Sequence, residues 1–506
     1  MRRYQIVAIL VFLAQTLGAQ DYSKTALEQA QATDIWWNAA NNASMLSSVS
    51  LPDYKDLSLN ASLTDGQFRR VTSAANLKDV SLQGDALFSL SGFKVAASLS
   101  TDGALAEDVR YMSSAYPWQH NMPYFIASLN RRSSSWRNFD AGADVKVASP
   151  LMLNDALSVG IDINLLYNAA RKMQNPTGNS SNVAIKIAPG VSYTLEDGKT
   201  LGFSFFYEKN PATTNLTPNP GTSIALMQGL GFFSSTLIRE SDYYFACDRN
   251  SFGADFQAIL PSDGGQYLID VNFKKGITGV YERIDKICPL TNLESVAFGA
   301  TLKGIFGERK NRVLTLGADY ENIYGVEYRT NYDAEAQKYY IAGEQTRTRG
   351  SFVNALLNYD LYLGKNTLGE YKWKAGVGAA FNSELSRYYS TEETQFKTNE
   401  VEMGAYLGPN ISLDNSSSLL VCLNAGYKFA VGTDYSFKGG DARYSAIYKE
   451  EAEFVKTPWM RSGLTLRYTR SLGKISLYCE ADGWMVSPLG KNINRAAASL
   501  SAGLVF

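Results

Sequence analysis

The fold is decided by residues 157–168, which read LSVGIDINLLYN. Every second residue from Leu157 to Tyr167 is apolar or aromatic, whereas the intervening positions include Gly160, Asp162 and Asn164. Such period-two alternation is typical of a β-strand with one apolar face and one polar face. The stretch also matches the roughly 9–11 residues that a tilted strand needs to cross a membrane. It therefore predicts a membrane-spanning strand.

The same alternation recurs from about residue 137 to the last residue. The other clear runs lie at 183–193, 201–207, 267–273, 371–381, 401–407, 421–429, 464–468 and 496–506. One face of each run carries no charge, and a charge facing lipid at the bilayer midplane costs roughly 2–4 kcal/mol. Strands of soluble proteins average about 5–6 residues, whereas several of these runs extend over about 10–14. The repetition indicates a large all-β protein that crosses a membrane many times.

The connections between the runs alternate between short and long. Short polar turns lie at 196–199, 261–265, 308–311, 364–366 and 414–417, and long ones at 210–250, 276–294, 323–346, 384–397 and 432–458. Bacterial barrels have short periplasmic turns and long extracellular loops. We therefore predict a transmembrane antiparallel β-barrel of about 16–18 strands with an even strand number. Residues 80–91 and 93–100 form the best upstream hairpin for closing it.

The N-terminus has the pattern of an export signal. Met1-Arg2-Arg3 precedes the apolar run 6–14 and the small residues Gly18 and Ala19. A basic start, a short apolar run and a small-residue exit are typical of a secretory signal peptide, which we place at 1–19. The run is shorter than the roughly 20 residues of a membrane-spanning helix. Export and the strand pattern together predict the outer membrane of a Gram-negative bacterium.

Residues 20–52 differ from the rest of the chain, and the barrel is expected to occupy 53–506. The stretch 26–30 favours a helix, and Trp36, Trp37 and Asn38 follow it closely. Two interpretations stay open for this N-terminal segment. It forms either a periplasmic segment beneath the barrel or a plug folded into the lumen, with Trp36, Trp37 and Asn38 as the plugging residues.

The face opposite the apolar one carries charges of both signs. The residues predicted to line the lumen are Asp162, Lys186, Asp255, Asp270, Lys372, Lys374, Glu400, Glu402, Arg461 and Arg467. An aqueous channel in a barrel of this size is lined by polar groups. Rings of a single sign, which would indicate ion selectivity, are absent from this pattern. Mixed charges fit either an open channel or an interior closed by salt bridges.

The sequence offers little chemistry for catalysis, metal binding or nucleic-acid binding. The chain has one histidine, His120, and no distinctive nucleophile or orienting group lies near it in sequence. No His and Cys residues have metal-ligand spacing. The formal net charge is -1, without the basic stripe that nucleic acid requires. We therefore expect no catalytic residues, no metal, no cofactor and no nucleic-acid partner.

Two of the four cysteines are candidates for a disulfide. Cys247 and Cys288 lie in the predicted long loops that flank the strand pair near 251–260 and 266–275. Those loops would emerge side by side on the outer surface, where an oxidising environment preserves disulfides. The sequence predicts a Cys247–Cys288 bridge, with two free thiols as the alternative.

Several motifs carry a resemblance to a known family. They are Tyr116-Pro117-Trp118, Trp136-Arg137-Asn138, Asp140-Ala141-Gly142-Ala143-Asp144, Leu157-Ser158-Val159-Gly160 and Asn175-Pro176. In these and in its rhythm of strands and loops the chain resembles an uncharacterised, porin-like Bacteroidota family of outer-membrane barrels, known only as a domain of unknown function. The exit Ala19-Gln20 also resembles Bacteroidota signal peptides. The family's charged Asn-Asp-Pro loop departs here to Gln174-Asn175-Pro176.

The C-terminal strand resembles a second known signal. Residues 500–506 alternate and end in the aromatic Phe506, similar to the signal that barrel-assembly machinery reads. This signal implies barrel-assembly machinery as a partner, and the expected location implies outer-membrane lipid and lipopolysaccharide. A periplasmic or surface protein partner belongs to the partner-binding alternative below. The resemblances supply no established activity.

Three functions follow from these observations. The first is a passive or gated channel for small solutes. The second is a structural or partner-binding barrel with a closed lumen, such as a surface or secretion-complex subunit. A membrane-embedded hydrolase comes third. Its main candidate residue is His120, which has no distinctive nucleophile or orienting group near it in sequence, so we expect the protein not to be an enzyme.

Overall fold

The computed structural model describes residues 22–115, 124–128, 133–217, 223–228, 233–238, 242–283, 286–307, 310–389, 393–436 and 442–506. The predicted signal peptide at 1–19 and His120 lie outside the described residues.

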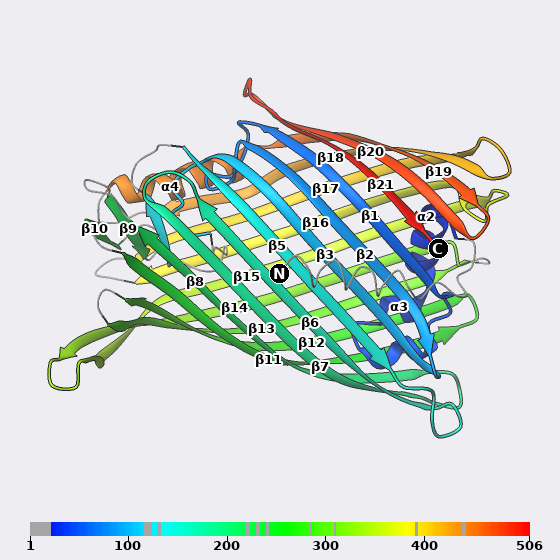
Figure 1. Cartoon of the computed structure of the whole chain (residues 1–506), viewed down its shortest axis with the longest axis horizontal. Helices are drawn as coiled ribbons and strands as arrows, with labels where there is room; N and C mark the ends of the chain where they lie inside the picture. Colours follow the sequence, from blue (N-terminus) through cyan, green and yellow to red (C-terminus); the bar gives the residue numbers. More distant parts are fainter. Residues whose placement is uncertain are drawn as a thin grey trace.

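Eighteen strands of the described chain form one antiparallel sheet that closes on itself (Figure 1). They are β1 (Tyr54–Gly66), β2 (Asn76–Leu90), β3 (Phe93–Val109), β5 (Ser134–Ala148), β6 (Leu157–Lys172), β7 (Thr177–Thr194), β8 (Thr200–Thr217), β11 (Tyr243–Ser262), β12 (Gly265–Arg283), β13 (Ile287–Phe306), β14 (Arg312–Asp333), β15 (Lys338–Lys365), β16 (Tyr371–Tyr389), β17 (Glu393–Ser412), β18 (Ser417–Ser436), β19 (Trp459–Leu472), β20 (Ile475–Pro488) and β21 (Arg495–Val505). Each strand pairs with the next, and β1 pairs with β21 to close the ring. The predicted barrel and its strand number are confirmed.

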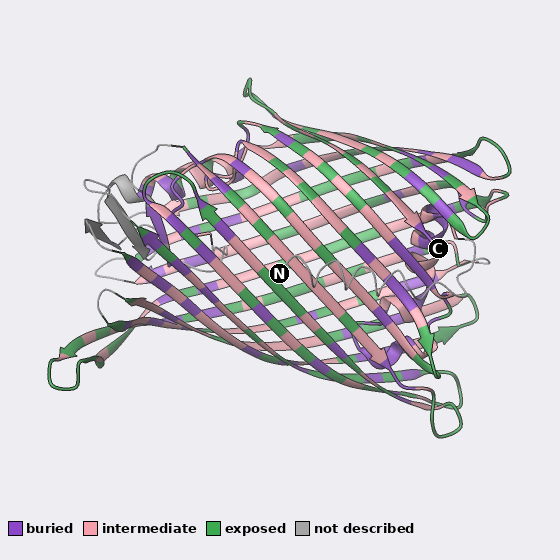
Figure 2. Cartoon of the chain, viewed as in Figure 1, coloured by how far each residue is buried: buried purple, intermediate pink, exposed green. Residues whose placement is uncertain are grey.

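Alternating exposure along each strand shows which face of the wall looks outward. On β6, Leu165 and Tyr167 are exposed, whereas Asp162 and Ala170 are buried. The same alternation recurs around the ring in Figure 2, where exposed and more deeply buried positions succeed one another along the strands. Large apolar side chains dominate the exposed set on β7, β8 and their neighbours. This is the outward apolar band expected of a barrel in lipid.

Strand β1 is not singled out by the sequence analysis, yet it closes the barrel. Leu59 and Leu63 face outward and are exposed, and Ala61 lies opposite Leu500 of β21. The alternating signal is present, with Ser58, Asn60 and Ser62 between the apolar residues, but it extends only over 57–63. The strand is therefore recognisable mainly from its pairing.

Several segments predicted as long loops are largely paired strand. β12 continues to Arg283 and β13 begins at Ile287, so most of 276–294 belongs to the sheet. Likewise β14 extends to Asp333 and β15 begins at Lys338. Beyond the lipid there is no penalty for outward polar residues, so alternation fades before pairing ends. The β14–β15 hairpin projects beyond the rest of the wall, at the lower left of Figure 1.

Smaller elements lie at the two ends of the barrel. The end that holds the C-terminus and the short turns also holds α2 (Lys24–Thr33), α3 (Ile35–Asn38) and the 3-10 helix η1 (Ala43–Ser48) (Figure 1). The other end carries α4 (Ala442–Lys456) and a small sheet of β4 (Phe125–Ser128), β9 (Ser223–Gln228) and β10 (Phe233–Ile238). Within the described residues, no helix is both long and apolar enough to cross a bilayer.

Candidate functional site

The N-terminal segment, residues 22–50, forms three short helical pieces, and a polar side chain caps each of them. The Ser23 hydroxyl accepts the backbone N–H of Ala26 at the start of α2. Asp34 accepts from two backbone N–H groups at the start of α3, and Asn42 accepts from the N–H of Ser44 in η1. Ser, Asp and Asn are favoured at such positions because they satisfy N–H groups that the helix leaves unpaired.

Contacts with strands on several sides place this segment inside the barrel. α2 contacts β14 and β20, α3 contacts β12, and η1 contacts β3, β5, β6 and β7. These strands belong to different parts of one closed ring. A segment that touches all of them lies within the ring. The sequence leaves two interpretations open for this segment. Its contacts with the inner wall agree with the one in which it is folded into the lumen.

Apolar side chains of the segment are fully buried against the wall. Leu27, Ile35, Met45 and Leu46 are each at most 1% exposed. Leu27 and Leu46 share a cluster with wall residues of β1, β2, β5 and β20, while Ile35 and Met45 share another with residues of β11 to β16. Full burial of such a side chain contributes roughly 1.5–3 kcal/mol. The segment is therefore packed into the barrel and not merely threaded through it.

Three glycines on neighbouring strands form the seat of η1. Gly160 on β6, Gly190 on β7 and Gly202 on β8 approach the segment so closely that a Cβ would collide with it. At Gly160 the obstacle is backbone around Ala43 and Ser44, at Gly190 it is the Asn42 side chain, and at Gly202 it is the Met45 side chain, followed by Asn42. Gly160 and Gly190 lie directly opposite each other in the sheet. The wall is shaped for this segment, a signal that alternation alone does not reveal.

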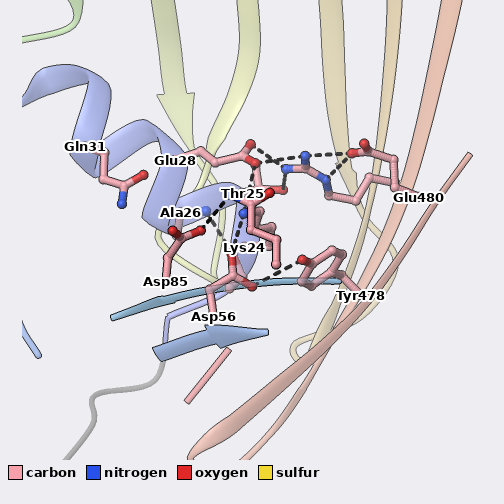
Figure 3. Close-up of polar contacts among 12 residues, drawn as sticks. Lys24, Thr25, Ala26, Glu28, Gln31, Asp56, Asp85, Tyr478 and Glu480 are labelled. Atoms are coloured by element: carbon pink, nitrogen blue, oxygen red, sulfur yellow. Dashed lines mark hydrogen bonds and ion pairs between the residues drawn. The ribbon is translucent and has the colours of Figure 1, made fainter. Parts of the chain in front are cut away.

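Arg467 of β19 connects the segment to the wall through two carboxylates. Its Nη1 and Nη2 donate to the two oxygens of Glu28 at 2.6 and 3.0 Å, and its Nε donates to Glu480 of β20 at 2.6 Å. Figure 3 shows Glu28 and Glu480 reaching toward the same point from α2 and from the wall. Paired hydrogen bonds between a guanidinium and a carboxylate are among the stronger polar contacts in proteins.

A second ionic contact lies beside the first. The Lys24 ammonium donates to Asp56 of β1 and lies 3.6 Å from Glu28. Asp56 also accepts the hydroxyl of Tyr478 at 3.2 Å (Figure 3). Strands β1, β19 and β20, close to the seam of the barrel, are thus all joined to α2.

Charge compensation shifts the pKa of both α2 residues in the direction of the charged form. Burial opposes ionisation of Glu28, but Arg467 and then Lys24 outweigh it and hold the pKa of this carboxyl below its usual 4.5. Burial likewise opposes the charge on Lys24, and Asp56 and Glu28 outweigh it, so the pKa of Lys24 is raised. Both groups therefore remain charged at neutral pH.

The far side of the segment is fixed to the β15–β16 turn. The Ser23 hydroxyl donates to Glu370, and the side-chain oxygen of Gln29 accepts the backbone N–H of Tyr371 at 2.8 Å. Glu370 also accepts from Asn410 of β17 at 2.7 Å. Because η1 of the same segment contacts β5 and β6, which lie across the ring from β14 and β15, the segment bridges the barrel from wall to wall.

The three residues predicted as plugging residues all touch the wall or its clusters. The Trp37 ring meets Tyr54 of β1 edge-on at 6.2 Å between ring centroids. Trp36 packs against both apolar clusters of the segment. Asn38 accepts from Lys303 of β13 and donates to the backbone oxygen of Asp34. Sequence reasoning missed Lys24 and Glu28, whose role depends on partners far away in the chain.

The opposite end of the barrel is occupied as well, by residues 124–128 and α4, which we call the outer lid. Tyr124 is fully buried, and its hydroxyl lies 2.9 Å from Glu327 of β14 and 3.1 Å from Thr348 of β15. Ile126 joins the same apolar cluster, which includes residues of β8 and β11 to β14. Residues 124–128, between β3 and β5, therefore pack inward against the wall.

α4 packs across the barrel from this cluster. Ile447 and Tyr448 are buried with residues of β2, β3, β5, β6 and β17. Glu451 pairs with Arg70 at 3.1 Å and accepts the backbone N–H of Val71 at 3.2 Å. Arg70 and Val71 belong to the β1–β2 connection, so α4 is tied to the strands that close the ring.

Predicted lumen residues on the first half of the wall contact one another or neighbouring polar groups. Lys186 lies 3.5 Å from Asp162, which is buried. Asp255 accepts the Ser204 hydroxyl at 3.1 Å. In the same way Asp270 accepts the amide of Gln257 at 2.8 Å, and both of these side chains are buried.

The second half of the wall shows similar pairing. Glu400 forms an ion pair with Lys428 at 2.9 Å, and Arg467 joins Glu28 and Glu480 as described. The Lys374 ammonium lies over the Tyr406 ring at 5.8 Å, and the Arg461 guanidinium lies over Trp484 at 5.0 Å. Two further predicted residues, Lys372 and Glu402, are exposed. Opposite charges from adjacent strands therefore neutralise much of this surface locally.

The predicted disulfide is wrong, because both thiols are free. Cys247 lies on β11 opposite Val280, and Cys288 lies on β13 opposite Glu282, so β12 separates them. Two strand spacings of about 4.7–4.9 Å exceed the roughly 7 Å limit for a disulfide. Both segments are paired strands instead of the adjacent loops expected from the sequence. Among the described residues, no cluster of His, Cys, Asp and Glu side chains is arranged to hold a metal.

Sequence comparison identifies the family. The description "Family of unknown function (DUF6850)" matches residues 43–506. The chain belongs to this family. The matched region of this DUF6850 member begins at η1 and contains every strand of the barrel. No curated protein sequence matches the chain.

Solved structures with similar backbones are other large outer-membrane barrels. The copper transporter OprC is 10% identical, with a TM-score of 0.41, over 89% of this chain and 80% of OprC. A FadL homologue from Pseudomonas aeruginosa is 11% identical, with a TM-score of 0.37, over 97% of this chain and 99% of that one. The ferric citrate transporter FecA is 9% identical, with a TM-score of 0.38, over 90% and 78%. These likenesses are too distant to carry an argument about cargo.

Proposed function

We propose that this protein is an outer-membrane channel for small solutes that is gated at both ends. The N-terminal segment closes the periplasmic end, and the outer lid closes the extracellular end. The carrying observation is that one covalently attached segment crosses the lumen and contacts β5 and β6 on one side and β14 and β20 on the other. A passive, permanently open pore does not fit such an arrangement.

The way the segment is held supports a gate that moves. Besides its buried apolar side chains, the segment is attached by charged and polar contacts with Asp56, Glu370 and Arg467. Water can replace the polar side-chain contacts of the segment when it moves, whereas the continuous backbone pairing of the strands keeps the wall in place. A pocket of about 390 Å³ also lies between the segment and the turns at this end, lined in part by Gln29, Trp36 and Tyr371. Space is therefore present beside the segment into which it can shift.

Single-channel conductance of four forms of the refolded protein tests the proposal. The forms are the mature chain, one lacking residues 22–50, one with residues 124–128 and α4 replaced by Gly-Ser linkers, and one with both changes. We expect rare openings from the mature chain, more frequent ones from each single change, and steady conductance when both ends are cleared. If the doubly changed barrel is silent while retaining the heat-shifted mobility of a folded barrel, the lumen is not a route.

A reversible lock avoids relying on deletions. Ser23→Cys and Glu370→Cys place two thiols at the contact between α2 and the β15–β16 turn, in a Cys479→Ser background that removes the exposed native thiol. Joining them with a reducible cross-linker should suppress the openings, and reduction should restore them. Openings that persist in the locked protein would exclude the segment as the gate.

The second candidate is a partner-binding barrel with a permanently closed lumen. The observation that favours it is the projecting β14–β15 hairpin, where Tyr332, Tyr340 and Ile341 are exposed beyond the rim. Exposed aromatic and aliphatic side chains in one place are typical of contact surfaces. The mature chain separates the two candidates in the conductance experiment, since a permanently closed barrel shows no openings until its ends are cleared.

A further inference from the structure

Two arginines face each other on the outer surface of the barrel. Arg137 of β5 lies directly opposite Arg171 of β6, and both side chains are exposed. The preceding residue on β5, Trp136, lies opposite Lys172 of β6, and that pair is buried on the inner side. Because side chains alternate along a strand, the two guanidinium groups project outward.

This arrangement is unfavourable for the protein alone. Side chains directly opposite each other have Cβ atoms about 4.5–5.5 Å apart, and like charges in that position destabilise a sheet. Within the described residues, no carboxylate forms an ion pair with Arg137 or Arg171. The charges therefore call for a counter-charge from outside the chain.

A second outward pair on the same barrel shows the compensated case. Arg349 of β15 lies opposite Arg387 of β16. There Glu393 lies 3.2 Å from Arg387, and the Arg349 guanidinium lies over the Tyr324 ring at 5.9 Å. The protein thus supplies a carboxylate and an aromatic ring to one arginine pair and leaves the other without a carboxylate.

The uncompensated pair lies at the level expected for lipid headgroups. On its membrane side are the exposed rings of Phe139 and Tyr167, with centroids 6.4 Å apart. Aromatic residues of this kind mark the interface of membrane barrels. On its outer side, Ser135 and Gln174 hydrogen-bond to each other. The pair therefore lies between the aromatic band and the polar rim, at the end opposite the termini.

Neighbouring side chains add hydrogen-bond donors. Asn179 of β7 lies opposite Arg171, and Asn215 of β8 lies opposite Asn179, and all three are exposed. A guanidinium presents a planar fork that matches two oxygens of a phosphate, and an amide N–H₂ group contributes a further donor. Two such forks side by side favour a phosphate group over a carboxylate of a single acid.

We propose that Arg137 and Arg171, with Asn179 beside them, bind a phosphate of the lipid A headgroup of lipopolysaccharide in the outer leaflet. The proposal rests on the outer-membrane location and orientation given under the proposed function, and is independent of gating. Phe139 and Tyr167 lie where the first part of an acyl chain would pass, which distinguishes lipid A from free phosphate.

The test compares two matched double variants in lipid bicelles. Arg137→Gln with Arg171→Gln removes the proposed site, and Arg349→Gln with Arg387→Gln removes the compensated pair and the same charge. Native mass spectrometry counts bound bis-phosphorylated lipid A, and titration gives its affinity. We expect about tenfold weaker binding for the first variant, the effect of losing a charge-assisted contact, and no change for the second. Equal lipid A affinity in all three proteins would overturn the proposal.

Thermal stability provides a readout that a structural role would not give. In non-ionic detergent without lipid A, the Arg137→Gln, Arg171→Gln variant should unfold at the same temperature as the parent protein or a higher one, because repulsion is removed. Added lipid A should raise the unfolding temperature of the parent more than that of the variant, reversing the order. A variant already less stable in lipid-free detergent, or a parent stabilised equally by inorganic phosphate, would contradict a lipid site. A barrel without conductance leaves these results unaffected.

Discussion

At the scale of single residues, the hold on the N-terminal segment is concentrated in a few contacts. Arg467 joins Glu28 to Glu480, and neighbouring Lys24 joins Asp56. The three glycines opposite η1 contribute in another way, by leaving space. The ion pairs and the absence of side chains at these glycines therefore both help to hold the N-terminal segment in place.

Replacing Glu28 with Gln should loosen the segment. The substitution removes one of the two carboxylates on Arg467 and leaves Glu480 in place, so the barrel should fold normally while openings become several-fold more frequent. Single-channel recording measures the frequency, and Glu196→Gln in the exposed turn between β7 and β8 serves as the control with the same loss of charge. Equal opening frequencies in the two variants would mean that the ion pair does not hold the segment.

The same contact predicts a pH dependence. The pKa of Glu28 is lowered from 4.5, since the attraction of Arg467 and Lys24 outweighs burial. A lowered carboxyl pKa contributes stability that is complete above the ordinary pKa and is lost as pH falls through the lowered one. We expect openings to become frequent only below pH 4.5, and this acid response to disappear in Glu28→Gln. An unchanged acid response in the variant would assign it to other groups.

Adding a side chain to the seat should displace η1. In Gly190→Val the new methyl groups meet Asn42, and overpacking of this kind typically costs about 1–3 kcal/mol, so openings should rise about tenfold or more. The control is Gly103→Val, where a Cβ has open space on the outward side of β3. Proteolytic cleavage between residues 22 and 50 should increase in Gly190→Val. Protection equal to that of the control would argue against a tight seat.

At the scale of elements, the strands were predictable and the closures were not. A lipid-facing position tolerates no charge, so β6 to β8 and β16 to β21 carry a local signal that can be read from their own residues. The outer lid and the N-terminal segment have no such signal, because what buries Tyr124 or Leu27 is wall from distant parts of the chain. The same reason explains the misjudged cysteines: pairing beyond the membrane continues without alternation. Alternation showed which charged residues share the inward face of the strands, but it did not show which of them form ion pairs with one another.

α4 should dock more tightly at acidic pH. Burial raises the pKa of Glu451, with Arg70 and the Val71 N–H opposing it in part, so the neutral form is favoured when the helix is docked. A raised carboxyl pKa contributes stability that is complete below pH 4.5 and is lost as pH rises through the raised value. A spin label at exposed Lys449, with Cys479→Ser, should become more mobile over that rise. Glu451→Gln should abolish the change, and its persistence in that variant would implicate another group.

At the scale of the whole molecule, wall and closures are separable. The wall is a complete ring of hydrogen-bonded strands, and none of its pairings passes through residues 22–50 or α4. Clearing both ends should therefore leave an open barrel with the heat-shifted mobility of the parent and a lower unfolding temperature. Loss of that mobility on removing either closure alone would show that the contents are needed to hold the ring.

The pairing of β1 with β21 also has a consequence for how the barrel assembles. The N-terminal segment runs directly into β1, and β1 is the strand that the C-terminal strand must find to complete the ring. Strand β1 is therefore connected to the N-terminal segment both through the chain and through the Lys24–Asp56 ion pair. We therefore expect closure of the wall and insertion of the segment to occur together during assembly, so that no empty barrel is formed on the way.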